Sequence, residues 1–362
     1  MSTIRDVAKE AGVSTATVSR TFTTPNIKPT KTQTKVLEAA RKLGYRSRHQ
    51  QIGKEWSEDG SFFSPALPAG LQNMIGFQFF ASGPGDSLSS NAFYGPILHG
   101  AEKEASSLGL HMLLNTTDAH ASLQDLPSMV KNHIVRSMLL VGSADPQMLA
   151  TISQHVPNLI LVDNYDDNRN YESIVSDGFG GAYQATKYLL DLGHREEIKF
   201  LMPDYPSKTL QDRLRGFVCA LFENGVESLS NKVITLPEDH QKCTDPKAAI
   251  VEFLQSSGRP TALLCGNDYY AHKVIQACWD IGLKIPDDLS VIGFDDIEFS
   301  QQSCPPLTTV RVDKEWMGRF AVRRLFERLR SEAGAQQTQQ AKLLEPHVIP
   351  VSLIVRGSCR AL

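Results

Sequence analysis

Short hydroxyl side chains and one arginine stand close together near the N-terminus, at Ser14, Thr15, Thr17, Ser19 and Arg20. Hydroxyl and cationic groups suit phosphate oxygens, and an arginine can donate two hydrogen bonds to the edge of a guanine. The local charge favours the same chemistry, because ten Lys/Arg and three Asp/Glu in residues 1–50 give +7, which leaves −10 for the rest of a chain whose net charge is −3. This asymmetry fits a polyanion-binding module joined to a larger body, and a solvated basic face is the alternative.

A second set of polar side chains follows apolar, strand-sized runs in the larger part of the chain. Asp163, Asn267 and Asp295 each come directly after such a run. Parallel α/β sheets bind ligands outside the carboxyl ends of their strands, so these side chains are expected near one another. Together with Arg213, on the helical stretch 210–224, they supply acceptors and forked donors for a polyhydroxylated ligand such as a sugar.

Several of these residues have a second interpretation. Asp268 and Asp295 also suit helix N-caps, and capping is favoured for Asp268. Four aromatic residues near the end of the first strand of the body could stack on a sugar: Phe79, Phe80, Phe93 and Tyr94. One of the pair Phe77 and Phe79 is expected to belong to the core. The ligand identity stays open among a sugar, a sugar phosphate, a sugar acid and a nucleobase.

Helix-capping residues divide the N-terminal segment into three short helices. Gly12 ends the first, because glycine takes a left-handed C-terminal conformation at little cost. Ser14 caps the second, and Thr30 or Thr32 starts the third. The turn between the first two is so short that they must cross at a steep angle, as in a helix-turn-helix whose second helix lies in the major groove of DNA.

Strand-like and helix-like stretches alternate from residue 73 onward, after a Gly-, Pro- and Ser-containing linker. Strands are expected at 74–81, 110–115, 137–142, 159–162, 198–202, 232–236, 262–266 and 289–294, and helices at 95–107, 179–192, 210–224, 245–256 and 269–282. Buried runs that alternate with helices predict parallel sheets covered by helices. A stretch of about 290 residues suits two such layered units better than one.

The composition excludes several other classes of protein. Hydrophobic residues make up 41% of the chain and charged residues 21%, which excludes a disordered chain. No apolar run approaches the ~18 residues of a membrane helix and no apolar signal core begins the chain, so a cytoplasmic protein is expected. Six scattered cysteines without a CxxC pair indicate neither a disulfide framework nor a zinc site. No metal and no cofactor are expected.

The N-terminal segment and the body together resemble the LacI/GalR family of bacterial transcription regulators over nearly the whole chain. The residues that carry the resemblance are 3–8 (TIRDVA), 11–20 (AGVSTATVSR), 31–32 (KT), 43–45 (LGY), 185–195, 213–217 (RLRGF), 265–268 (CGND), 285–296 (IPDDLSVIGFDD), 306–310 (PLTTV) and 356–358 (RGS).

The resemblance implies an architecture in three parts. A helix-turn-helix domain is expected at residues 1–48, a linker or hinge at 49–72, and a body at 73–362 shaped like a periplasmic sugar-binding protein. The body would hold two Rossmann-like lobes joined by three chain crossings. Lobe 1 is placed at about 73–176 and 307–340, and lobe 2 at about 177–306 and 341–362.

The resemblance also implies a function: a homodimeric, sequence-specific repressor on a near-palindromic operator, controlled allosterically by a small polar ligand. In the family the positions of Thr15, Ala16 and Arg20 read bases. Phosphate contacts are expected from Ser14, Thr17, Ser19, Lys31, Arg46 and Arg48. The family commonly contacts its effector at the positions of Asp163, Arg213, Asn267 and Asp295, to which Phe80 and Tyr94 are added here.

The linker departs from the family pattern. Family members usually follow the tyrosine with Pro-Asn and a hinge helix whose leucine wedges into the minor groove, whereas Tyr45 is followed by Arg-Ser-Arg. Lys54 stands where the wedge leucine would be. Ile52 and Trp56 are the substitute wedges in this sequence, and packing against the body is the alternative for Trp56.

Two rival classes are weighed against a regulator. A nicotinamide-dependent enzyme would need a dinucleotide-binding turn, and residues 177–182 (DGFGGA) lack the full GxGxxG spacing. A transport-type sugar-binding protein would need the body alone, so the basic N-terminal helices argue against it.

Overall fold

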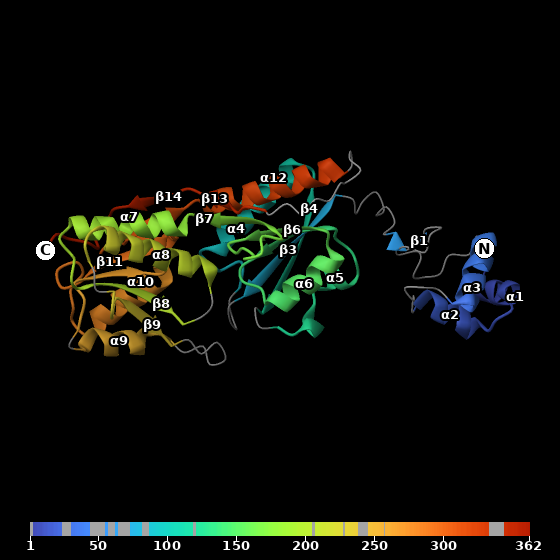
Figure 1. The fold of residues 1–362 in the computed structure, drawn as a ribbon, viewed down its shortest axis with the longest axis horizontal. Helices are drawn as coiled ribbons and strands as arrows, with labels where there is room; N and C mark the ends of the chain where they lie inside the picture. The colour runs from blue at the N-terminus through green and yellow to red at the C-terminus, as the bar shows by residue number, and fades with distance from the viewer. Residues whose placement is uncertain are drawn as a thin grey trace. The chain divides into compact units, whose positions relative to one another are not determined.

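The computed structural model describes residues 3–23, 30–43, 55–56, 62–63, 73–81, 87–118, 121–204, 207–226, 229–237, 245–256, 258–332 and 344–362. The chain divides into two compact units, residues 1–73 and residues 74–362. They are called the head and the body below, and each is described by itself (Figure 1).

The head contains the three predicted helices, α1 (Ile4–Ala11), α2 (Thr15–Thr23) and α3 (Lys31–Lys42). Gly12 ends α1 in the left-handed conformation with φ 66°, as the sequence predicted. Thr30, not Thr32, begins α3, because its side-chain oxygen accepts a hydrogen bond from the backbone N–H of Gln33. The predicted helix-turn-helix is therefore confirmed.

Small apolar side chains from all three helices form the core of the head. Its buried members are Val7, Ala8, Val18, Val36, Ala39 and Ala40. The ammonium of Lys42 on α3 lies 2.7 Å from the carboxylate of Glu10 on α1 and ties these two helices at the surface. The head thus has an apolar core of its own, which fixes the angle between its helices.

A two-stranded antiparallel pair lies inside the predicted linker. β1 (Glu55–Trp56) pairs with β2 (Phe62–Phe63), and Trp56 stands opposite Phe62. The assignment of residues 49–72 as a linker or hinge stays a prediction, and the structure adds this short strand pair within it. Ile52 and Lys54 lie outside the described residues.

The body consists of two six-stranded sheets with helices on both faces (Figure 1). The first sheet has the order β13-β7-β6-β5-β3-β4, with strands β3 (Met74–Ala81), β4 (His111–Asp118), β5 (Ser137–Val141), β6 (Asn158–Val162), β7 (Glu172–Ser176) and β13 (His347–Ile349). The second has the order β14-β12-β11-β10-β8-β9, with β8 (Ile198–Pro203), β9 (Val233–Leu236), β10 (Ala262–Cys265), β11 (Ser290–Asp295), β12 (Thr308–Val312) and β14 (Val351–Ile354). All neighbouring pairs are parallel except β12 with β14. The predicted α/β fold class is confirmed.

Alternate residues of each strand pack on opposite faces, as a two-sided sheet requires. The helices of the body are α4 (Tyr94–Ser107), α5 (Ser128–Lys131), α6 (Pro146–His155), α7 (Gly178–Asp191), α8 (Lys208–Glu223), α9 (Lys247–Gln255), α10 (Asp268–Asp280), α11 (Glu298–Gln302) and α12 (Lys314–Glu332), with a short 3-10 turn at Leu123–Asp125. In the first sheet Leu139 packs in the core under α4 and α12, while Leu140 packs in the core under α5 and α6. In the second sheet Leu264 belongs to the α7 and α8 side and Leu263 to the α9 and α10 side.

Within the described residues the chain crosses between the sheets at three places, and two of these crossings lie at other residues than the predicted lobe boundaries. Residues 307–340 were assigned to lobe 1, whereas β12 pairs with β11 in the second sheet. Residues 341–362 were assigned to lobe 2, whereas β13 pairs with β7 in the first sheet. The chain crosses at Asp313, which caps α12 through the backbone N–H of Trp316, and at Pro350, which has no N–H to continue a ladder.

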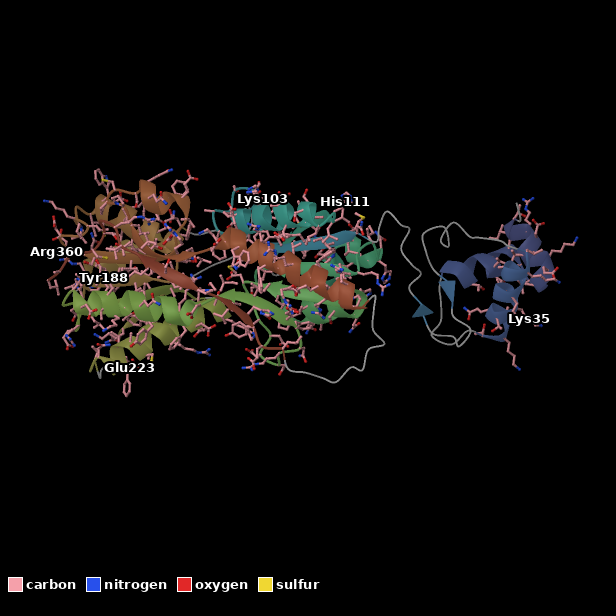
Figure 2. All side chains as sticks on the ribbon, turned by 90° about the horizontal axis from the view of Figure 1, so that it is seen from above. Lys35, Lys103, His111, Tyr188, Glu223 and Arg360 are labelled. Carbon is pink, nitrogen blue, oxygen red and sulfur yellow. The ribbon has the colours of Figure 1, made fainter. Side chains whose placement is uncertain are left out.

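None of the described helices combines the length and the low polarity of a membrane-spanning segment. The C-terminal residues end at the second sheet, where the backbone N–H of Leu362 donates to the carbonyl of Leu192 after α7. Figure 2 labels Arg360 and Tyr188 at this end of the body.

Candidate functional site

The candidate DNA-binding surface begins at the N-terminus of α2. The Ser14 hydroxyl accepts a hydrogen bond from the backbone N–H of Thr17 at 3.1 Å, so it caps the helix. It also lies 2.9 Å from the Thr17 hydroxyl. Thr15 and Ala16 are exposed on the first turn, and Thr17 is half-buried. The first turn of α2 therefore presents small side chains to solvent next to a capped helix N-terminus.

The basic residues of the head are only partly described. Lys31 is exposed at the start of α3, as is Lys35 one turn later (Figure 2). The backbone of Ser19 and Arg20 belongs to α2, but their side chains lie outside the described residues, as do Arg46 and Arg48 entirely. The expected base contact of Arg20 and the phosphate contacts of these residues therefore stay predictions.

Arg213 is the centre of the candidate effector site in the body. Its side chain projects from α8, only 4% of the residue is exposed, and its guanidinium lies 3.9 Å from the ring centre of Phe294. Nη1 donates to the carbonyl of Gly266 at 2.6 Å, and Nη2 donates to Oδ1 of Asp295 at 3.0 Å. Nε is buried without a partner among the described atoms. Arg213 therefore joins the ends of β10 and β11.

Asp163 approaches this centre from the end of β6 in the first sheet. Tyr94, at the start of α4, donates its hydroxyl to Oδ2 of Asp163 at 2.8 Å, while Oδ1 is buried without a partner among the described atoms. Burial raises the pKa of Asp163 to about 6, and the charge of Arg213 opposes this rise. Asp163 also has φ 59°, a left-handed conformation that Asp tolerates better than most residues.

The structure thus brings together four of the predicted effector residues, Tyr94, Asp163, Arg213 and Asp295. Asp295 is buried at the end of β11 with φ 110°, and burial raises its pKa while Arg213 and Lys314 lower it. Residues in such sparsely populated backbone conformations are often held at binding sites.

Asn267 takes the capping role that was predicted for Asp268. Asn267 caps α10, because its Oδ1 accepts from the backbone N–H of Tyr270 at 3.1 Å. The capping prediction for Asp268 is wrong. Its carboxylate instead accepts hydrogen bonds from Ser300 Oγ, Thr309 Oγ1 and the backbone N–H of Ile297. Burial raises the pKa of Asp268 to about 7.

Phe80 does not join the other effector residues. It is 2% exposed and packs in the core between the first sheet and α5 and α6, because it points to the opposite face from Phe79. The ring of Phe79 lies 4.9 Å from that of Tyr94, and the ring of Phe93 lies 5.0 Å from it. The aromatic surface next to Asp163 therefore comes from Tyr94 and its neighbours, and Phe80 is omitted from the site.

Two lysines with a structural role near this site were missed by sequence reasoning. Lys314 donates to the backbone carbonyls of Asp295, Asp296 and Val312, so it holds the ends of β11 and β12 together. Lys208, at the start of α8, donates to the carbonyl of Tyr165 at 2.7 Å. A lysine that binds backbone carbonyls leaves no pattern in sequence, since any residue can offer the carbonyl.

Lys208 belongs to a set of contacts between the two lobes. Its ammonium lies 3.0 Å from the carboxylate of Asp167, and the Tyr165 hydroxyl donates to Asp212 on α8 at 3.3 Å. Tyr165 and Asp167 follow β6 of the first sheet, whereas Lys208 and Asp212 belong to the helix next to the second sheet. We call these four residues the interlobe latch.

The glycine-rich turn before α7 is accounted for by capping and packing. The Asp177 carboxylate accepts a hydrogen bond from the backbone N–H of Gly180 at 2.7 Å. A Cβ on Gly180 would lie 2.2 Å from this carboxylate, and one on Gly181 would lie 2.8 Å from Val310 and Val351. These glycines are therefore required where α7 packs on its own cap and on the second sheet.

Comparisons with known proteins agree with this arrangement. The model of the bacterial regulatory proteins of the lacI family matches residues 3–47, and a periplasmic binding protein-like domain matches residues 186–359. The chain is 30% identical over 335 residues to the "HTH-type transcriptional repressor PurR" of Photobacterium profundum, covering 92% of this chain and 93% of that protein. It is also 30% identical to the protein of that name from Haemophilus influenzae, with all of both chains covered.

Solved structures share the fold over most of the chain. The lac repressor dimer bound to operator and an anti-inducer has a TM-score of 0.65 at 24% identity, with 99% of both chains covered. A complex of the transcriptional regulator CelR with cellobiose has a TM-score of 0.64 at 22% identity, covering 99% of this chain and 100% of that one. A LacI family regulator from Enterococcus faecium with bound ribose has a TM-score of 0.66 at 23% identity, covering 80% and 99%.

The helix-turn-helix head and the two-lobed binding body define a ligand-responsive DNA-binding regulator. The chain belongs to the lacI family of bacterial regulatory proteins. Members of this family bind operator DNA and small-molecule effectors and act as dimers.

Proposed function

We propose that this protein is a repressor whose affinity for operator DNA is controlled by a small polar ligand, a sugar or sugar derivative, bound among Tyr94, Asp163, Arg213 and Asp295. The observation that carries the proposal is a pair of buried polar atoms without partners among the described residues. Oδ1 of Asp163 comes from the first lobe and Nε of Arg213 from the second. Buried polar groups normally have hydrogen-bond partners, so such a pair supports a ligand site.

A ligand that bonds to both lobes would favour one arrangement of the lobes over others. If that arrangement sets the spacing of the two heads in a dimer, ligand binding changes operator affinity by the coupling free energy, typically about 1–3 kcal/mol. The cellobiose and ribose in two structurally similar regulators support a sugar. A nucleobase is the second candidate, because its adjacent N–H and C=O groups offer the same donor and acceptor beside the Tyr94 ring.

We also propose that the site binds its ligand without catalysing a reaction. Arg213 and Asp295 are held in an ion pair, and Asp268 accepts three hydrogen bonds from protein groups. These groups are engaged in fixing strand ends rather than poised to transfer a proton.

Residues of the head would bind DNA in two ways. Thr15, Ala16 and Arg20 would contact base edges, while Ser14, Thr17, Ser19, Lys31, Arg46 and Arg48 would contact phosphates. The proposed functional domains are a DNA-binding domain at 1–48, a linker at 49–72 and an effector-binding and dimerisation domain from 73.

A titration on DNA tests the proposal. The operator is first selected from random duplexes, and binding is followed by fluorescence anisotropy with and without ligands that raise the melting temperature. We expect at least one sugar or nucleobase to change operator affinity fivefold or more, and Arg20→Ala to lose about 1–3 kcal/mol of discrimination between the selected site and a scrambled one. Indifference to duplex DNA at low salt would refute the proposal.

A further inference from the structure

We infer that the effector is electrically neutral and carries a hydrogen-bond donor next to an acceptor, so that phosphorylated or carboxylated ligands bind much more weakly than their neutral counterparts. The inference rests on the proposed function, because it concerns the same site. It follows from how the charged groups around Asp163 and Arg213 are already used.

The arginine at the site is committed to protein groups. Arg213 forms an ion pair with Asp295, which it meets at 3.0 Å with both side chains almost fully buried. Its other Nη donates to the carbonyl of Gly266, and its Cζ lies 3.9 Å from the ring centre of Phe294. Arg213 can still donate one hydrogen bond from Nε to a neutral acceptor, but its positive charge is already balanced by Asp295.

The neighbouring cations are engaged as well. The three N–H groups of Lys314 are matched by three backbone carbonyls. Arg311 and Arg356 both donate to the carboxylate of Asp296, at 2.7 Å each. Within the described part of the body, each cation around the end of β11 therefore already has an acceptor from the protein.

Among the described residues, Asp163 has no ion-pair partner of its own. The charges that act on it are Arg213, which is paired with Asp295, and Asp295 itself, while the one described hydrogen bond of its carboxylate comes from the neutral Tyr94 hydroxyl. A ligand that donates a hydrogen bond to Oδ1 would satisfy the carboxylate oxygen that has no partner among the described atoms. An anionic ligand would instead bring a second negative charge to a buried carboxylate, which is strongly unfavourable in a low-dielectric site.

Matched pairs of ligands test the inference on the full-length protein. The pairs are glucose with glucose 6-phosphate, glucose with gluconate, ribose with ribose 5-phosphate, and inosine with inosine 5′-monophosphate. Melting temperatures are screened at pH 7.5, and dissociation constants of each responding pair are measured by titration calorimetry. We expect the neutral member of the responding pair to bind at least tenfold more tightly, and the pair that responds distinguishes a sugar from a nucleobase.

A charge-neutralising variant tests the cause. Asp163→Asn keeps the shape and removes the unpaired charge, so we expect the affinity ratio of neutral to anionic ligand to fall at least threefold. Asp191→Asn is the matched control, because Asp191 is an exposed carboxylate that meets Lys187 on α7, and its ratio should equal that of the wild type. Because the ratio compares two ligands on one protein, a general loss of stability in Asp163→Asn does not imitate the effect.

The outcomes separate this inference from the proposed function. An anionic ligand that binds as tightly as its neutral counterpart, or more tightly, overturns the inference and leaves effector control standing. An unchanged ratio in Asp163→Asn also overturns it. Absence of any response across neutral and anionic ligands contradicts the proposed effector site itself.

Discussion

The ion pair between Arg213 and Asp295 permits a quantitative prediction about the body. Arg213→Met keeps much of the volume of the side chain but removes the charge, and it leaves the Asp295 carboxylate buried without its cation. Breaking a buried pair from one side costs about 3–5 kcal/mol, because an uncompensated charge remains in the interior. The carbonyl of Gly266 loses its donor at the same time.

The double variant Arg213→Met with Asp295→Asn separates the charge from the packing. It removes both charges, so the stranded carboxylate is absent and most of the lost stability should return. We expect an interaction free energy of about 2 kcal/mol or more in the double-mutant cycle. For a body of this size, the single variant should lower the melting temperature by on the order of 10 °C.

The pH dependence of the single variant provides an independent check. Burial raises the pKa of Asp295 and Arg213 lowers it, so loss of the arginine should raise this pKa further. A carboxyl whose pKa is higher in the folded state costs stability as the pH rises and it ionises. The penalty of Arg213→Met should therefore be larger at pH 8 than at pH 5.

Urea unfolding followed by tryptophan fluorescence measures these differences, because Trp279 and Trp316 are two of the three tryptophans and lie on α10 and α12 of the body. Binding of the head to nonspecific duplex DNA serves as the control for intact protein. If the single and double variants are equally destabilised at every pH, the lost stability does not come from an uncompensated charge on Asp295, and the ion pair does not have the role assigned to it.

Three further predictions concern other parts of the molecule. Lys208→Met removes the ammonium of the interlobe latch and should change effector affinity at least threefold in calorimetry. Lys187→Met, which breaks only a surface pair within α7, should leave the affinity unchanged. Equal affinities in both variants would show that the latch does not affect the arrangement of the lobes that binds the effector. Ser14→Ala removes the cap of α2 and should cost about 1 kcal/mol of head stability, seen as a lower helical signal of residues 1–48 on heating and as weaker DNA binding. Ser14→Asp should retain the cap. Equal stability of the head in both variants would contradict the capping role of Ser14. Burial raises the pKa of Asp163 to about 6, so ionisation of this carboxyl destabilises the folded state; the cost is absent below pH 3.8 and complete above about pH 6. In urea unfolding, the stability of Asp163→Asn relative to the wild type should therefore increase by up to about 3 kcal/mol between pH 4 and pH 7.5. A stability difference that does not change with pH would refute the raised pKa.

Much of the local structure could be predicted because its causes lie within a few residues. Gly12 and Ser14 end and start helices through bonds to their own neighbours, and the apolar run at 74–81 is a strand over its full predicted length. Strands with weaker patterns were missed. β7 and β12 contain polar Glu172, Thr308 and Thr309, whose burial depends on partners elsewhere in the chain.

The residues of the effector site were predicted more accurately than their hydrogen-bond and packing partners. The family positions placed Asp163, Arg213 and Asp295 in one site, and the structure brings them together. The sequence did not predict that Asn267 caps α10, that Asp268 binds the segment between β11 and β12, or that Phe80 faces the core. Each of these outcomes depends on which neighbour lies within hydrogen-bond or packing distance after folding.

The sequence by itself determined the class of this protein: a basic three-helix head, an acidic α/β body and polar residues at strand ends. Periodicity, caps and charge are local properties, and they can be seen without any long-range contact. Only the tertiary structure decided the partners of the site. Tyr94 meets Asp163 across 69 residues and Arg213 meets Asp295 across 82, and such pairs form only when the sheets bring distant strand ends to one place.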